Sequence, residues 1–196
     1  MLYIPIGSEL ENRRLGLIGF GASARQLAGR AKAFGMKISA IDIRDISPEE
    51  QREFGLEFVG KSADLDQVLA GSDFVSVHLH LNQHTRHIID DRRLRLMKPT
   101  ACLINVARGA LVDEKALFDA LREGRLGGAG LDVFGQEPLD PDHPLLKLPN
   151  VVATPHISGT TDGTSRRRAA CAARNVDRVA EGLDPLYRVD LPPNVG

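Results

Sequence analysis

The chain has 196 residues, of which 42% are hydrophobic and 26% charged, and its 25 Lys and Arg residues nearly balance 26 Asp and Glu residues. This composition is typical of a soluble globular protein and excludes a chain that is disordered throughout. The net charge of −1 gives no reason to expect nucleic acid or an acidic membrane as a partner, and no uncharged apolar stretch reaches the roughly 18 residues needed to span a bilayer.

Short apolar runs alternate along the chain with segments of helical periodicity. The predicted strands are residues 15–19, 36–41, 56–59, 74–77, 100–106, 126–133 and 151–153. The predicted helices are residues 24–34, 64–70 and 113–123, and a last helix has an apolar face from Ala169 to Leu183. Continuous apolar strands that alternate with helices predict right-handed βαβ units and a doubly wound parallel sheet in three α/β/α layers.

A glycine-rich turn, Gly19-Phe-Gly-Ala-Ser-Ala24, follows the first predicted strand and opens the first helix. It fits the GxGxxA form of the dinucleotide fingerprint, in which Gly19 permits the tight turn and Gly21 lets the backbone approach a pyrophosphate. Asp42 ends the next strand, 23 positions after Gly19, where a carboxylate accepts ribose hydroxyls. Taken singly, these features fit a plain strand–helix turn and a solvated loop acid. Together they predict a Rossmann-like fold that binds NAD rather than NADP, a preference that Arg44 weakens slightly.

Polar residues follow three of the later strands, namely Arg108, Asp132 and His156. Open α/β sheets bind ligands beyond the carboxyl ends of their strands. An arginine fork binds carboxylate and a histidine transfers protons near neutral pH, which suits chemistry on a carboxylate-bearing carbonyl. Taken singly, Arg108 fits a surface charge, His156 a loop residue satisfied by backbone, and Glu137 the cap of a turn.

Four blocks occur in order along the chain: Gly19–Ala24, Asn105–Gly109, Gly130–Pro138 and Thr154–Gly159. They resemble the signatures of the D-isomer-specific 2-hydroxyacid dehydrogenases, a family that includes phosphoglycerate dehydrogenase and glyoxylate/hydroxypyruvate reductase. The resemblance extends over about Gly7 to Leu183. It implies an NAD-dependent oxidoreductase domain that transfers hydride between nicotinamide and a small 2-hydroxy or 2-oxo acid, and it implies a homodimer.

The resemblance also implies roles for particular residues. Arg108 would orient the 2-oxo acid, His156 would be the acid/base, and Glu137 would pair with His156. The nucleotide would contact Gly19, Gly21, Ala22, Ser23, Asp42, Leu79, Val106, Asp132 and Gly159. His80 departs from the family, because proline is usual at this position.

The family pattern includes a substrate domain that is largely missing from this chain. We expect residues 8–183 to form the NAD-binding domain, and residues 1–7 and 184–196 to be the hinge and tail that join the missing half. A non-catalytic NAD(H)-binding module or sensor is therefore the alternative function. We expect this chain alone to bind NADH without substantial turnover.

The histidines and cysteines bear on metal binding and on redox compartment. His78, His80, His84 and His87 form an HxH-x3-H-x2-H pattern, but no thiolate is adjacent and we expect no metal site. The two cysteines, 102 and 171, are far apart and form no CxxC motif, which favours the reducing cytoplasm.

Overall fold

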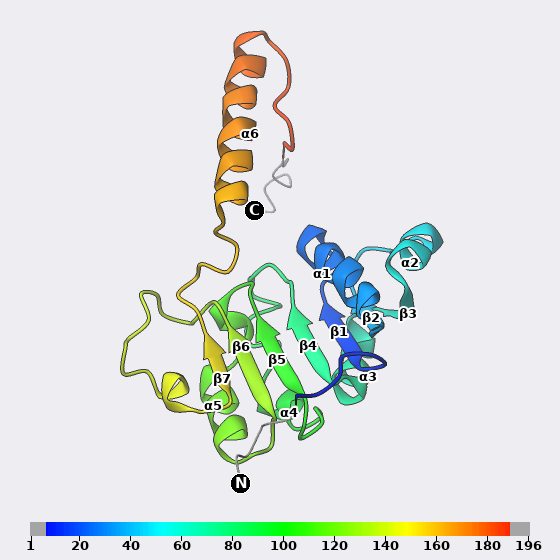
Figure 1. Ribbon diagram of the computed structural model, residues 1–196, viewed down its shortest axis with the longest axis vertical. Coiled ribbons are helices and arrows are strands. Elements are labelled where there is room, and N and C mark those ends of the chain that lie inside the picture. The colour runs from blue at the N-terminus through cyan, green and yellow to red at the C-terminus, as the bar shows by residue number, and fades with distance from the viewer. Residues whose placement is uncertain (1–6, 189–196) are drawn as a thin grey trace. The chain divides into compact units, whose positions relative to one another are not determined.

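The computed structural model describes residues 7–188, which divide into two compact units, one ending at His156 and the other beginning at Ile157. The first unit is built on a seven-stranded sheet in the order β3-β2-β1-β4-β5-β6-β7 (Figure 1). Its strands are β1 (Arg14–Ile18), β2 (Lys37–Ile41), β3 (Leu56–Gly60), β4 (Phe74–Val77), β5 (Cys102–Asn105), β6 (Gly128–Leu131) and β7 (Val151–Ala153).

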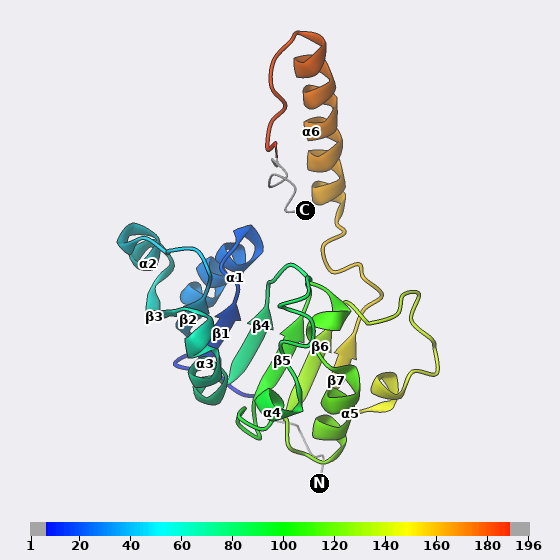
Figure 2. The same cartoon turned by 180° about the vertical axis from the view of Figure 1, so that it is seen from behind.

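All six strand pairings of this sheet are parallel. The chain builds outward from β1 to β3 and then crosses to the other side of β1 to begin β4. This reversal is a topological switch point, and in open α/β sheets the crevice outside such a point binds the ligand. The predicted Rossmann-like, doubly wound sheet is therefore confirmed (Figure 2 shows it from behind).

Helices cover both faces of the sheet and make two separate apolar cores. The helices of this unit are α1 (Ala22–Ala33), α2 (Pro48–Phe54), α3 (Leu65–Gly71), α4 (Asp91–Leu94) and α5 (Glu114–Arg122). On one face, the β1 residues Leu15 and Leu17 pack with buried alanines of α1. On the other face, α3 and α5 pack over β4, β5 and β6. These cores are the two interfaces of the predicted three-layer arrangement.

Several boundaries differ from those that the sequence predicts. β5 and β6 are shorter than the predicted runs 100–106 and 126–133, because the residues beyond each strand leave the sheet as loops. α2 was not predicted, although Ser47 and Glu50 form a capping box at its start and Gly55 ends it with a φ of 65°.

An ion-pair cluster joins α3 to α4. The Asp66 carboxylate in α3 accepts hydrogen bonds from Arg92 Nη1 at 2.6 Å and Arg93 Nε at 3.1 Å. These contacts lower the pKa of Asp66 to about 2. The cluster holds the end of the long segment between β4 and α4, part of which reaches the candidate site.

The second unit contains α6 (Asp162–Ala180) and the segment that returns beside it (Figure 1). The Asn175 side chain accepts from the N–H of Leu186 at 2.7 Å and donates to its carbonyl at 3.2 Å. None of the α6 residues is buried. The predicted single domain over residues 8–183 stays a prediction, and the predicted hinge and tail extend beyond the described residues.

Candidate active site

The β1–α1 turn is open to a ligand on its outer side. Gly19 has a φ of +92°, and a Cβ there would lie 2.7 Å from the carbonyl oxygen of His78, so the tight turn requires glycine. Gly21 caps α1 without a side-chain hydrogen bond, and the first turn of α1 has no acidic residue. A Cβ on Gly21 would meet nothing within 4 Å. Free N–H groups at an uncrowded helix start fit the pyrophosphate of a dinucleotide.

Asp42 lies directly after β2, beside this turn. Its Oδ2 accepts the N–H of Phe20 at 2.6 Å, and its Oδ1 accepts the N–H of Arg44 at 2.8 Å. Because each carboxylate oxygen can accept two hydrogen bonds, the side chain keeps acceptor capacity for the hydroxyls of a ribose. The backbone contacts fix the carboxylate at the place where the fingerprint requires it.

A hollow of about 350 Å³ lies between the β1–α1 turn and the loops after β4 and β5. It brings three predicted nucleotide contacts, Ser23, Leu79 and Val106, together with Arg108. The other lining residues are His78, His80, Leu81 and Ala107. Residues predicted for the cofactor and for the substrate thus share one surface.

His78 also lines this hollow, although in the sequence it stands out only as part of the histidine pattern. Its Nδ1 lies 3.1 Å from Ser23 Oγ, and its Nε2 lies 2.9 Å from Ser76 Oγ. Burial lowers the pKa of His78 to about 4, so the imidazole is neutral near pH 7. Within residues 7–188, no three His, Cys, Asp or Glu side chains are grouped so as to hold a metal ion.

The loop after β5 carries Arg108 and is fixed from below by Asn105. The Asn105 side chain is buried, donates to the carbonyl of Arg108 at 2.9 Å and accepts the N–H of Ala107 at 3.1 Å. A Cβ on Gly109 would lie only 1.9 Å from the carbonyl carbon of Phe134, so this loop touches the backbone of the loop after β6. The Arg108 residue itself is exposed, with Nη1 donating to the carbonyl of Ala107 at 2.5 Å.

Glu137 and His156 form a hydrogen-bonded pair across the loops after β6 and β7. The His156 Nδ1 lies 2.7 Å from Glu137 Oε2, and Glu137 Oε1 accepts the N–H of Phe134 at 3.0 Å. The hydrogen bond to His156, followed by that from Phe134, holds the pKa of Glu137 below its usual range. An ionised Glu137 favours a proton on Nδ1 and leaves His156 Nε2 for proton exchange with a ligand.

Asp132 and Thr154 support this pair from the ends of β6 and β7. Asp132 is 4% exposed, and its Oδ1 accepts the Thr154 hydroxyl at 2.6 Å. The carbonyl of Thr154 also accepts the N–H of His156 at 3.0 Å, where His156 turns with a φ of 55°. Thr154 is a positioning residue that sequence reasoning missed, because nothing local to the chain shows that it meets Asp132.

The structure therefore brings the predicted residues together in two groups. One group is the hollow that contains Arg108, and the other is the Glu137–His156 pair with Asp132 beneath it. Gly159 belongs to the second unit, so its predicted contact with the nucleotide stays a prediction.

Residues 4–158 match the family described as the NAD binding domain of D-isomer specific 2-hydroxyacid dehydrogenases. The chain belongs to this family. The expected resemblance is thus confirmed over most of the chain, and the fingerprint turn, Asp42 and the Glu137–His156 pair all lie inside the matched residues.

Relatives in this family differ in substrate. The chain is 44% identical over 191 residues to a glyoxylate reductase of Korarchaeum cryptofilum, covering 97% of this chain and 54% of the relative. It is 41% identical to a D-3-phosphoglycerate dehydrogenase of Methanocaldococcus jannaschii, covering 95% of this chain and 34% of that protein. The chain thus spans about half of the first relative and about a third of the second.

Solved structures of the family carry either cofactor. A D-lactate dehydrogenase with NAD+ from Lactobacillus jensenii superposes with a TM-score of 0.84 at 30% identity, covering 95% of this chain and 58% of that one. A family member from Xanthobacter autotrophicus Py2 in complex with NADPH has a TM-score of 0.81 at 33% identity, covering 97% and 75%. Membership of the family therefore does not decide between NAD and NADP.

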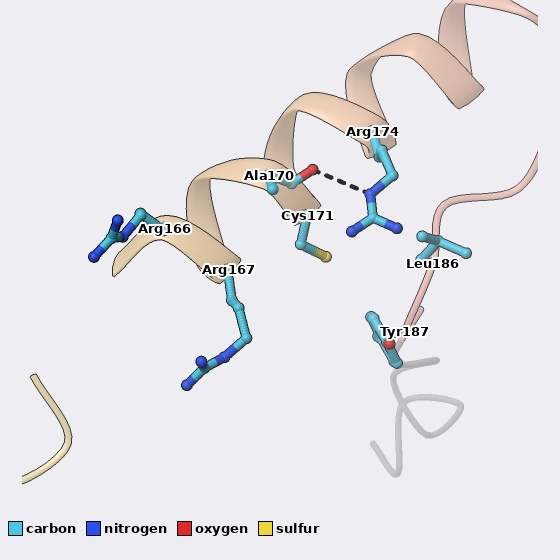
Figure 3. Close-up of a pocket in the computed structure, with 7 residues that line it drawn as sticks. All are labelled: Arg166, Arg167, Ala170, Cys171, Arg174, Leu186 and Tyr187. Atoms are coloured by element: carbon cyan, nitrogen blue, oxygen red, sulfur yellow. Dashed lines mark hydrogen bonds between the residues drawn. The ribbon is translucent and has the colours of Figure 1, made fainter. Parts of the chain in front are cut away.

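The second unit has a hollow of its own, between α6 and the returning segment (Figure 3). Arg166, Arg167, Cys171 and Arg174 contribute to its lining, and no predicted site residue does. All three arginines of this set are exposed.

Across residues 7–188, no helix is both long enough and apolar enough to cross a membrane.

Proposed function

We propose that this chain is the nucleotide-binding half of an NAD-dependent dehydrogenase that interconverts small 2-hydroxy and 2-oxo acids. The observation that carries the proposal is the Glu137–His156 hydrogen bond of 2.7 Å in a unit whose β1–α1 turn is built for a dinucleotide. A carboxylate–imidazole pair can act as a general acid–base that moves a proton to or from an alcohol oxygen. This pair therefore favours a catalytic domain over a module that only binds a nucleotide.

The proposed chemistry divides between cofactor and protein. The nicotinamide, when bound, accepts or supplies the hydride. His156 Nε2 donates a proton to the substrate oxygen during reduction and removes it during oxidation, and Glu137 stabilises the imidazolium form. Arg108 binds the substrate carboxylate through its guanidinium fork and polarises the adjacent carbonyl.

We further propose that the cofactor is NAD(H) rather than NADP(H). Asp42 supports this preference, because its carboxylate can accept both ribose hydroxyls and repels a 2′-phosphate. Ser23, Leu79 and Val106 line the hollow through which the rest of the dinucleotide would run. Calorimetric titration should show tighter binding of NADH than of NADPH, and equal affinities would contradict the role of Asp42.

A cytoplasmic location and a homodimer complete the proposal. Both cysteines, Cys102 and Cys171, are free, which fits a reducing compartment. The family resemblance implies the homodimer, and analytical ultracentrifugation of the chain would test it.

The deciding experiment measures loss of NADH absorbance with glyoxylate, hydroxypyruvate, pyruvate and phosphohydroxypyruvate. The chain should be tested alone and in a form that also carries a substrate domain. We expect NADH binding in both forms and turnover only in the second, because the exposed Arg108 needs a closed cleft to hold a substrate against the nicotinamide. NADH binding without turnover in either form would favour the alternative of a non-catalytic NAD(H) sensor.

A further inference from the structure

Two arginines at the adenosine end of the dinucleotide site are both held by one carboxylate, that of Glu50 in α2. Arg44 makes a bidentate pair with it, with Nη1–Oε2 at 2.7 Å and Nη2–Oε1 at 3.1 Å. Arg25 in α1 adds a third contact, from Nη2 to Oε1 at 2.9 Å. One acidic side chain therefore pairs with a cation from α1 and with another from the loop after β2.

This cluster adjoins the carboxylate that is proposed to bind the ribose. The N–H of Arg44 binds Asp42, and Arg44 Nη2 also donates to the carbonyl of Phe20 at 3.2 Å. The N–H of that same Phe20 binds Asp42. The Arg44 guanidinium and the Asp42 carboxylate are thus tied to the same residue, and both belong to the place where a 2′-phosphate would lie.

Both arginines could bind a phosphate if they were released from Glu50. In related folds an arginine near this position accommodates the 2′-phosphate of NADP. The Arg25 Nε is buried and makes no hydrogen bond within the described part of the chain, and its guanidinium carbon lies 5.9 Å from the centre of the Phe20 ring. The site therefore contains the cations of an NADP site, held by an internal acid.

We propose that Glu50 is a specificity-determining residue that makes this site prefer NAD by occupying Arg44 and Arg25. A 2′-phosphate would have to displace a bidentate carboxylate to reach either guanidinium, and it would also meet the charges of Glu50 and Asp42. The inference rests on the proposed function, since it concerns the same dinucleotide site. It adds a residue outside the fingerprint to those that determine cofactor preference, because Glu50 lies in α2, between β2 and β3.

The start of α2 keeps the Glu50 carboxylate in place. The N–H of Glu50 donates to Ser47 Oγ, and the N–H of Ser47 donates to Glu50 Oε2, both at 3.2 Å. This capping box fixes the residue at the third position of the helix. Glutamine also serves in a capping box, so Glu50→Gln removes the charge while preserving the helix start.

The test compares Glu50→Gln with Glu49→Gln. Glu49 is the preceding residue, and its substitution gives the same change in net charge. Its side chain is 74% exposed and pairs with Arg52 at 3.2 Å, away from Arg44 and Arg25. Calorimetry on the full chain would measure NADH, NADPH and the fragment pair AMP and adenosine 2′,5′-bisphosphate. We expect Glu50→Gln to raise affinity for both 2′-phosphorylated ligands by roughly three- to tenfold. Glu49→Gln should leave the preference unchanged.

The outcomes separate this inference from the proposed function. If the unmodified chain binds neither NADH nor NADPH, the proposed function fails and the inference falls with it. If the chain prefers NADH and Glu50→Gln leaves the preference unchanged, or shifts it no more than Glu49→Gln does, only the inference is overturned.

A second variant tests the same idea at one of the two arginines. Arg44→Gln should leave NADPH affinity nearly unchanged in the original chain, because the guanidinium is already paired. In the Glu50→Gln background it should remove most of the gain in NADPH affinity, and Arg25 accounts for the part that remains. A large loss of NADPH affinity on Arg44→Gln alone would show that Arg44 is already available to the phosphate and would contradict the role of Glu50.

Discussion

Replacing Gly109 with alanine tests whether the loops that carry Arg108 and Glu137 are held together by backbone contact. The added Cβ would lie 1.9 Å from the carbonyl carbon of Phe134 and 2.1 Å from its oxygen. Ordinary contact begins at 3.4 Å, so the two loops would have to separate by about 1.5 Å. Phe134 is only 5% exposed, and its movement would disturb the larger core.

We expect Gly109→Ala to lower the free energy of unfolding by roughly 3 kcal/mol or more, since overpacking usually costs about 1–3 kcal/mol and here backbone must move. Urea unfolding followed by circular dichroism would measure the loss. Gly29→Ala is the matched control, because Gly29 is an exposed α1 residue whose Cβ would meet nothing within 4 Å. It should stabilise by about 0.5–1 kcal/mol. A loss below about 1 kcal/mol for Gly109→Ala would refute the backbone contact.

Three further predictions concern proton transfer and pH. In a form with a substrate domain, His156→Gln should reduce turnover by ~10²–10⁴-fold while calorimetry shows unchanged NADH affinity, and near-normal turnover would assign the proton to another group. Because burial lowers the pKa of His78 to about 4 from 6.5, its contribution to stability is complete above pH 6.5 and is lost as the pH falls toward 4. Urea unfolding should show that the free energy of unfolding of His78→Asn depends less on pH between 6.5 and 4 than that of the original chain. An equal pH dependence in both proteins would contradict the buried, neutral state of His78. Arg92 and Arg93 lower the pKa of Asp66 to about 2 from 3.8, so its contribution is present above pH 3.8 and lost toward pH 2. Between pH 3.8 and 2, the free energy of unfolding should fall less steeply with decreasing pH in Asp66→Asn than in the original chain. Equal slopes in the two proteins would exclude a contribution from Asp66.

The sheet and the dinucleotide turn could be predicted because their signals are local. Gly19 and Asp42 stand at fixed places relative to apolar runs, and the positions of all seven predicted strands recur in the structure. Strand ends were less predictable, since Val106 and Val133 continue the apolar runs but leave the sheet. Val133 is 2% exposed, so its apolar character reports burial and not membership of a strand.

The supporting residues of the site could not be predicted because their partners lie far away in sequence. Asn105 fixes the Arg108 loop, Gly109 touches the next loop, and Thr154 reaches a carboxylate 22 positions earlier. Glu50 had a local signal, a capping box with proline at the first helical position, but its pairing with Arg25 depends on how two helices pack. The catalytic roles of Arg108, Glu137 and His156 remain predictions.

The shortness of β7 has a consequence for edge-to-edge pairing between the sheets of two copies. β7 is an edge of the sheet and has three residues, with Pro149 two positions before it and Pro155 two positions after it. Proline has no N–H to donate, so neither end of the strand can be lengthened into a ladder that would recruit a neighbouring sheet. The prolines also resist a one-residue slip, which would turn the 73% exposed Val152 inward. Pro155, which limits the strand at this end, is also the residue directly before His156, so the end of the edge strand and the start of the histidine loop coincide.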